Sequence, residues 1–86
     1  MDEHGAGPNP MRERFAVATR WAPGQAVVLT LFDPQGRRVA VVFGKAGETL
    51  VWDGRDSDGR RAKPGVYLYR LRRGPANENG RVVVLE

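Results

Sequence analysis

Apolar and polar residues alternate with a period of two along most of the chain, and no segment shows the period of an α-helix. A period of two places successive side chains on opposite faces of a β-strand. Gly, Pro, Asp or Asn residues stand in the gaps, as they do in chains that reverse direction through tight turns. The pattern predicts an all-β fold, a small antiparallel β-sandwich of six or seven strands. The predicted strands are residues 12–19, 26–32, 38–43, 48–52, 66–72 and 81–85.

The parity of the large apolar residues predicts which face of each strand points into the core. In the 66–72 strand, Arg70 and Arg72 take the opposite parity and are expected to face solvent. The residues predicted to face inward are Phe15, Val17, Val27, Leu29, Leu31, Val39, Val41, Phe43, Leu50, Trp52, Tyr67, Tyr69 and Leu71.

The segment from Trp52 to Leu71 is the stretch around which the predicted fold is organised. Dense Asp-Gly and Pro-Gly signals indicate a chain that reverses direction on the surface. Trp52 precedes the reversal and Tyr67 follows it, so we expect the two rings to meet in the core. The structural motif that carries this interpretation consists of Trp52, Asp53, Gly54, Asp58, Gly59, Gly65 and Tyr67.

Residues 1–10 are rich in Gly, Pro and Asn and show no periodicity, so we expect a flexible lead or linker before a sandwich at 11–86. His4, the chain's one histidine, falls in this lead and is expected to be incidental. A second polar stretch, 74–80, is predicted to be a loop before the last strand. No internal repeat is apparent.

Length and composition narrow the functional classes. At 86 residues the chain is expected to be one small domain, and without cysteine it can form neither a disulfide nor a thiolate metal site. No apolar run approaches the roughly 20 residues of a membrane helix, so no membrane span is predicted. The N-terminus lacks a signal-peptide pattern. If the domain is exported, we expect the signal to lie on a longer precursor.

The net charge of +4 raises the possibility of a nucleic-acid partner, but the distribution of the charge argues against one. No basic helix is available for a groove, and the aromatic residues are assigned to the core rather than to a stacking platform. An anionic surface such as lipopolysaccharide remains an open alternative. The arginines occur on nearly every predicted strand and turn: Arg12, Arg14, Arg37, Arg38, Arg55, Arg60, Arg61, Arg70, Arg72, Arg73 and Arg81.

Metal binding and catalysis are both disfavoured. Asp53, Asp56 and Asp58 invite a calcium hypothesis, but counting back from Gly59 puts Gly54 where an EF-hand loop needs its first ligand. We expect these carboxylates to accept turn N–H groups instead. Ser57 is the single serine, its neighbours are acidic, and His4 lies in the lead segment, so no nucleophile is predicted. The expectation is a protein without cofactor, metal or catalytic residues.

Three motifs carry a resemblance to a known family. They read Val27-x-Leu29-x-Leu31-Phe32-Asp33-x-x-Gly36-Arg37-x-Val39, then Trp52-Asp53-Gly54-Arg55-Asp56-x-x-Gly59, then Pro64-Gly65-Val66-Tyr67-x-Tyr69-x-Leu71. Together they resemble the immunoglobulin-like domain shared by flagellar hook-capping proteins and the type A C-terminal sorting domains of type IX secretion cargo. Pro8-Asn9-Pro10 resembles the opening of the sorting-domain version. The chain departs from the family pattern in two places. The loop before Trp52 is short, and the last residue is Glu86, where family members often carry a basic residue.

The resemblance implies an immunoglobulin- or fibronectin-III-like sandwich that recognises protein partners. A sorting domain would be the C-terminal address of a larger protein, folded in the periplasm and bound by the translocation apparatus on the way to the surface. The alternative is an assembly module, related to the hook-capping domain, that binds structural subunits. The Pro-Asn-Pro opening, and the match to the last residues of the chain, favour sorting. The oligomeric state is not predicted.

The last predicted strand is the candidate partner-binding element. Both faces of this strand are apolar, whereas a sheet with one face in water requires apolar residues on its buried face alone. Its second face or its free edge could dock a partner by strand addition or by side-chain insertion. Equally, the domain's own loops could cover both faces. The candidate residues are Arg81, Val82, Val83, Val84 and Leu85.

Overall fold

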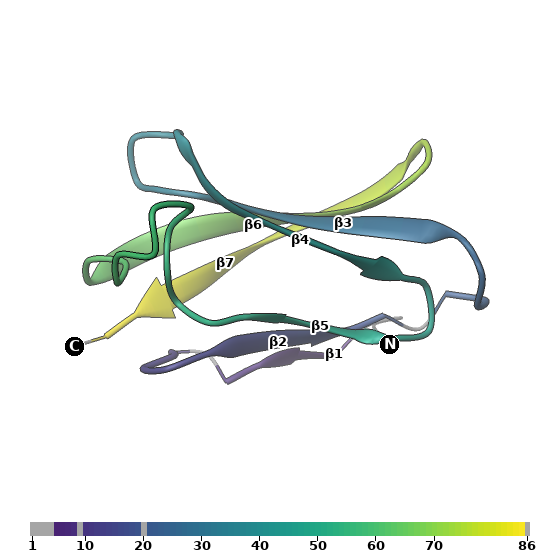
Figure 1. The fold of residues 1–86 in the computed structure, drawn as a ribbon, viewed down its shortest axis with the longest axis horizontal. Helices are drawn as coiled ribbons and strands as arrows, with labels where there is room; N and C mark the ends of the chain where they lie inside the picture. Colours follow the sequence, from purple (N-terminus) through teal and green to yellow (C-terminus); the bar gives the residue numbers. More distant parts are fainter. Residues whose placement is uncertain (1–4, 9, 20, 86) are drawn as a thin grey trace.

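Two antiparallel β-sheets face each other in the computed structural model, which describes residues 5–8, 10–19 and 21–85 (Figure 1). The smaller sheet has the strand order β1-β2-β5 and the larger sheet β4-β3-β6-β7, which confirms the predicted antiparallel sandwich. The part of the chain that the structure describes contains no helix long and apolar enough to cross a bilayer. The strands are β1 (Gly5–Gly7), β2 (Phe15–Ala18), β3 (Ala26–Phe32), β4 (Arg38–Lys45), β5 (Thr49–Trp52), β6 (Gly65–Arg73) and β7 (Ala76–Val84).

Strand β3 lies inside the larger sheet, between β4 and β6. Val27, Leu29 and Leu31 are fully buried, as their spacing predicts. Each such side chain contributes about 1.5–3 kcal/mol when it is removed from water. The alternation in β3 therefore fixes which face of the larger sheet turns toward the smaller one.

The inward face of β4 differs from the prediction. Ala40 is buried, whereas the ring of Phe43 is 77% exposed. Ala40 pairs with Leu31, and cross-strand partners share a face of the sheet, so the even-numbered residues of β4 from Ala40 onward point inward. Arg38 lies beyond the register shift and pairs with the outward Phe32. The inward assignment of Val41 and Phe43 was thus wrong, because every residue from 39 to 43 is apolar and the pattern fits either parity. Val39, beside a register shift between β3 and β4, is partly buried against the core.

Strands β6 and β7 form a long hairpin where the sequence predicts a loop. Pairing continues through residues 76–80, so most of the expected 74–80 loop is strand, and Gly74 and Pro75 form the turn. Residues 77–79 are polar because this end of the hairpin is exposed to water. A backbone ladder holds there without apolar side chains.

Gly80 allows an aromatic side chain to lie across this hairpin. It pairs with Tyr69, and a Cβ at position 80 would overlap the ring of Tyr69. The same ring lies against Phe15 of β2, with centroids 5.3 Å apart and a tilt of 50°. Tyr69 therefore links the two sheets, and glycine opposite it makes the room that the ring needs.

The smaller sheet contains part of the segment predicted to be a lead. Gly5–Gly7 form β1 and pair with β2, which is shorter than the predicted 12–19 strand. On its other side β2 pairs with β5, and Phe15 lies opposite Trp52. The division of the chain at residue 10 stays a prediction, and His4 lies outside the described residues.

The hydrophobic core fills the space between the two sheets. Every predicted inward residue of β2, β3 and β5 belongs to it, and so do Tyr67 and Leu71 of β6. Tyr69 is partly buried against it. The buried cluster comprises Met11, Phe15, Val17, Val27, Leu29, Leu31, Ala40, Ala46, Leu50, Trp52, Tyr67, Leu71, Val82 and Val84.

Candidate recognition surface

The segment from Trp52 to Tyr67 connects two buried aromatic residues, as predicted. Trp52 is 1% exposed and Tyr67 is 5% exposed, and their ring centroids lie 5.7 Å apart with a tilt of 50°. The indole Nε1–H of Trp52 donates to the carbonyl of Arg55 at 2.8 Å. The Tyr67 hydroxyl donates to the carbonyl of Lys63, also at 2.8 Å. Each ring is thus buried while its polar atom binds the turn that the two rings support.

The carboxylate of Asp56 organises the reversal between them. Its Oδ1 accepts the backbone N–H groups of Asp58 and Arg60, each at 2.9 Å. The N–H of Asp56 donates to the carbonyl of Arg60 at 2.8 Å. Asp53 acts in the same way on a smaller scale, because its Oδ1 accepts the N–H of Arg55 at 3.0 Å. These two carboxylates bind turn N–H groups, as the sequence predicts.

The turn between β3 and β4 repeats this arrangement. Oδ1 of Asp33 accepts the N–H groups of Gln35 and Arg37, each at 2.9 Å, and the N–H of Asp33 donates to the carbonyl of Arg37 at 2.8 Å. Gly36 and Gly59 both take positive φ angles, +83° and +82°. Both turns have the sequence Asp-x-x-Gly-Arg, a short repeat that the sequence analysis overlooked.

The electrostatics of this end of the sandwich keep Asp33 ionised and Tyr67 neutral. Burial opposes the charge on Asp33, but hydrogen bonds from Arg37 and its positive charge outweigh it, so the pKa of Asp33 is lowered from 3.8. The Nε–H of Arg37 donates to Oδ2 of Asp33 at 3.0 Å. Burial, and then the charge of Asp33, raise the pKa of Tyr67 above 10.0. Neither group changes its protonation near neutral pH.

Gly54 lies where the turn contacts the chain before β2. Its φ is +78°, and a Cβ there would lie 3.1 Å from the carbonyl oxygen of Glu13 and 3.2 Å from Cε of Met11. Gly65 begins β6. Asp58, although part of the predicted motif, is exposed and contributes its backbone N–H to the turn. Of the motif residues, Asp58 is thus the one whose side chain faces water at the tip of the turn.

The terminal strand divides between core and surface. Val82 and Val84 are buried, at 0% and 3% exposure, and contact the core. Arg81 is exposed, and Val83 and Leu85 are partly buried. Val82 and Val84 therefore point inward, and Arg81 and Val83 belong to the outer face of the larger sheet. Partner binding by these residues stays a prediction.

The chain itself occupies part of the free edge of β7. Met11 forms a parallel bridge with Val84. Its N–H donates to the carbonyl of Val83 and its carbonyl accepts the N–H of Leu85, both at 2.8 Å. The Met11 side chain is fully buried. Strand addition at this end of β7 would thus have to displace Met11, and the sequence gives no sign of this because the pairing joins distant parts of the chain.

The outer face of the larger sheet combines apolar side chains with cations. Among its outward positions Phe43, Leu68 and Val66 are exposed by 77%, 49% and 47%. The register of the sheet shows that the outward positions include five cations and no acidic residue. These positions are Ala26, Val28, Thr30, Phe32, Arg38, Val41, Phe43, Lys45, Val66, Leu68, Arg70, Arg72, Asn77, Asn79, Arg81 and Val83.

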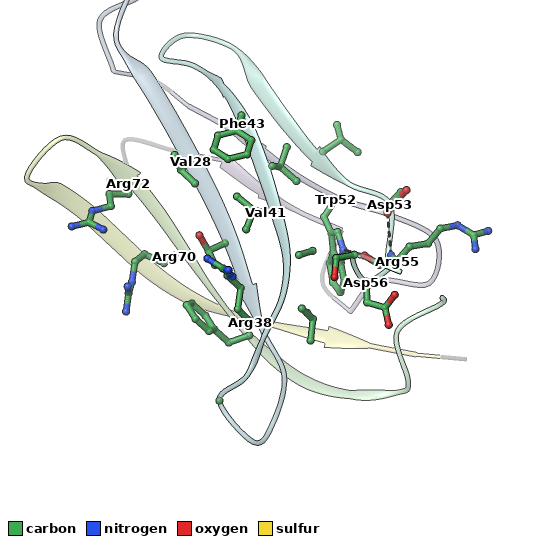
Figure 2. Close-up of a pocket in the computed structure, with 18 residues that line it drawn as sticks. Val28, Arg38, Val41, Phe43, Trp52, Asp53, Arg55, Asp56, Arg70 and Arg72 are labelled. Atoms are coloured by element: carbon green, nitrogen blue, oxygen red, sulfur yellow. Dashed lines mark hydrogen bonds between the residues drawn. The ribbon is translucent and has the colours of Figure 1, made fainter. Parts of the chain in front are cut away.

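A shallow depression crosses this face and continues over the edge of β4 (Figure 2). Val28, Val41 and Phe43 lie in its middle, and Arg70 and Arg72 stand on one side. On the other side, beyond β4, it reaches the turn that holds Asp53 and Asp56. The sequence analysis missed this surface, because Phe43 was assigned to the core and because the face forms only when four strands pair.

The sequence disfavours both catalysis and metal binding. Ser57 is exposed, and its N–H donates to the carbonyl of Val39 at 3.0 Å, which anchors the turn on the edge of β4. No three His, Cys, Asp or Glu side chains of the described ranges are grouped so that they could hold a metal ion. The absence of an enzymatic function stays a prediction.

Comparison with solved structures finds the same fold within two much longer proteins of Porphyromonas gingivalis. The dimeric latent form of PorU matches 95% of this chain and 9% of its own, with a TM-score of 0.75 and 26% identity. PorZ, described as an essential bacterial surface component of the type IX secretion system, matches 96% of this chain and 11% of its own, with a TM-score of 0.71 and 21% identity.

In contrast to the structural comparison, comparisons of the amino-acid sequence find no match. No family model matches the chain. No curated protein matches it either. The chain spans about a tenth of the length of PorU and of PorZ. It is therefore similar, over nearly its whole length, to one small part of each of these larger proteins, one of which belongs to a type IX secretion system.

Proposed function

We propose that this chain is a non-catalytic recognition module, the C-terminal sorting domain of a larger protein exported by a type IX secretion system. The observation that carries the proposal is the similarity of almost the entire chain to a small part of PorU and of PorZ. The three motifs that resemble sorting domains add independent support, because they depend on the sequence and not on the fold. The proposed route passes through the periplasm to the surface or the medium.

The terminal strand is the proposed contact with the secretion apparatus. Arg81 and Val83 project from the outer face, and Val83 lies beside the exposed Val66. The open edge of β7 is shorter than the sequence suggests, because Met11 pairs at its C-terminal end. Recognition is therefore assigned to outward side chains of β7 rather than to strand addition next to Val84. This assignment leaves the buried Val82 and Val84 a purely structural role.

A reporter fusion tests the proposal. A periplasmic reporter with its own export signal is joined to the N-terminus of residues 1–86 and expressed in a bacterium that has a type IX secretion system. We expect the fused reporter at the cell surface or in the medium, and the reporter without the domain in the periplasm. If the fusion folds and stays periplasmic, the sorting function is wrong. Specific binding to structural subunits of a surface appendage would instead favour the assembly alternative.

A further inference from the structure

The apolar side chains on the outer face of the larger sheet form a diagonal band that crosses all four strands. Cross-strand partners on one face lie side by side, so the register places each pair in contact range. The band runs from the edge of β4 at one end to β7 at the other. Its successive pairs are Phe43 with Val28, Val41 with Thr30, Phe32 with Leu68, and Val66 with Val83.

Three arginines form a second diagonal beside this band. Arg72 pairs with Val28, Arg70 with Thr30, and Arg81 with Leu68, so each arginine stands next to a member of the band on one and the same flank. All three are exposed. The guanidinium of Arg70 lies over the ring of Phe32, with Cζ 5.4 Å from the centroid, so it is held at the border of the apolar band.

The acidic residues near this face lie elsewhere. The outward positions of the four strands contain none, and the nearest carboxylates along the depression belong to Asp53 and Asp56, across the edge of β4 from Arg70 and Arg72 (Figure 2). Arg38 and Arg55 also line the depression, and Arg55 lies on the same side as these two carboxylates. The depression therefore has an apolar middle and more cations than carboxylates along its sides. A ligand that fits it needs apolar side chains together with an excess of negative charge.

We propose that this face binds an acidic segment of a protein partner, in which apolar side chains are flanked on one side by carboxylates. The apolar residues would fill the depression over Val28 and Val41, and the carboxylates would meet Arg70 and Arg72. An anionic bilayer fits less well. It is flat where this face is hollow, and its charge would meet Asp53 and Asp56 as well as the arginines. The inference stands on the face alone and does not rest on the proposed export route.

A peptide selection tests the proposal. A display library of random 16-residue peptides is selected on the 86-residue chain and, in parallel, on the Arg70→Glu/Arg72→Glu variant. We expect wild-type binders enriched in Asp and Glu next to aliphatic or aromatic residues, and variant binders that lose this enrichment. Affinity of the wild-type binders for the variant should fall at least about tenfold, because the reversal sets like charges against each other. Raised salt should weaken binding as well.

Matched controls make the result interpretable. Arg60→Glu/Lys63→Glu applies the same change of net charge to exposed side chains of the turn segment, and it should leave binding unchanged. Phe43→Ser should weaken binding without lowering the melting temperature, since the ring is already exposed. Selected peptides without acidic enrichment, or equal binding to both charge variants, would overturn the proposal. The proposal would also be overturned if the selection yields no peptide binder while the domain sediments with phosphatidylglycerol vesicles.

Discussion

The rings of Trp52 and Tyr67 lie against each other across the base of the turn that separates them in sequence, with centroids 5.7 Å apart. Each donates its polar hydrogen to a carbonyl inside that turn, at Arg55 and at Lys63. The pair thus joins β5 of one sheet to β6 of the other and holds the turn between them. The sequence predicts this contact, and in the structure it connects the two sheets of the sandwich.

Replacing Trp52 with alanine should therefore remove most of the stability of the domain. Loss of a fully buried aromatic side chain costs about 3–5 kcal/mol, a large part of the 5–15 kcal/mol that is typical of small domains. Urea unfolding followed by circular dichroism measures the change. Trp21→Ala is the matched control and should cost less, because Trp21 is only partly buried. Near-native stability of the Trp52 variant would refute the role assigned to this contact.

Replacing Gly80 with alanine should destabilise the domain by about 1–3 kcal/mol, the usual cost of overpacking. The added Cβ would collide with the ring of Tyr69, which would have to leave its place against Phe15. Asn79→Ala, at an exposed position of the same strand, is the control. Thermal melts of the Gly80→Ala/Tyr69→Ala double variant give the decisive comparison: the cost of the Gly80 change should disappear when the ring is absent.

The acid stability of the domain should depend on Asp33. Its folded-state pKa lies below 3.8, so the ionised carboxylate stabilises the folded state. That contribution is complete above the unfolded pKa and is lost as the pH falls through the folded one. Melting temperatures of the wild type and of Asp33→Asn should therefore differ at pH 7 and converge below pH 3.8. Asp58→Asn, at an exposed position of the other turn, is the charge control. A pH-independent gap for Asp33→Asn would contradict the assignment.

Calcium should not change the stability of the domain. Oδ1 of Asp53 and Oδ1 of Asp56 already accept backbone N–H groups of the turn. We expect the same melting temperature in millimolar calcium and in EDTA, measured by differential scanning fluorimetry. A drop of several degrees on chelation would show that the turn holds a metal ion.

The sequence predicts the fold best where apolar residues occupy a single parity. In β2 the two large residues, Phe15 and Val17, are separated by alanine, so one register buries both, as expected. In β4 both parities are apolar, and the choice falls to the partner strand, which selects Ala40 and leaves Phe43 outside. Residue types alone cannot make that choice, because it depends on pairing with a different part of the chain.

The dependence on strand pairing also explains which surface features could not be predicted from the sequence. Met11 is buried because it pairs with the far end of β7, and nothing in its neighbours predicts that pairing. The diagonal of Arg72, Arg70 and Arg81 exists only after the strands align. The Asp-x-x-Gly-Arg repeat, by contrast, could have been recognised from the sequence alone. Its two copies have the same spacing and make the same hydrogen bonds around Asp33 and Asp56.

The most direct test of the proposed function compares two charge insertions on opposite faces of the sandwich. Val83→Asp alters the outward side of β7, and Thr49→Asp alters the exposed side of β5 in the other sheet. Circular dichroism first establishes that both variants fold, and the fused reporter is then measured in the medium and in the periplasm. We predict that Val83→Asp leaves the reporter in the periplasm while Thr49→Asp is exported normally. Normal export of a folded Val83→Asp variant would contradict recognition through the terminal strand.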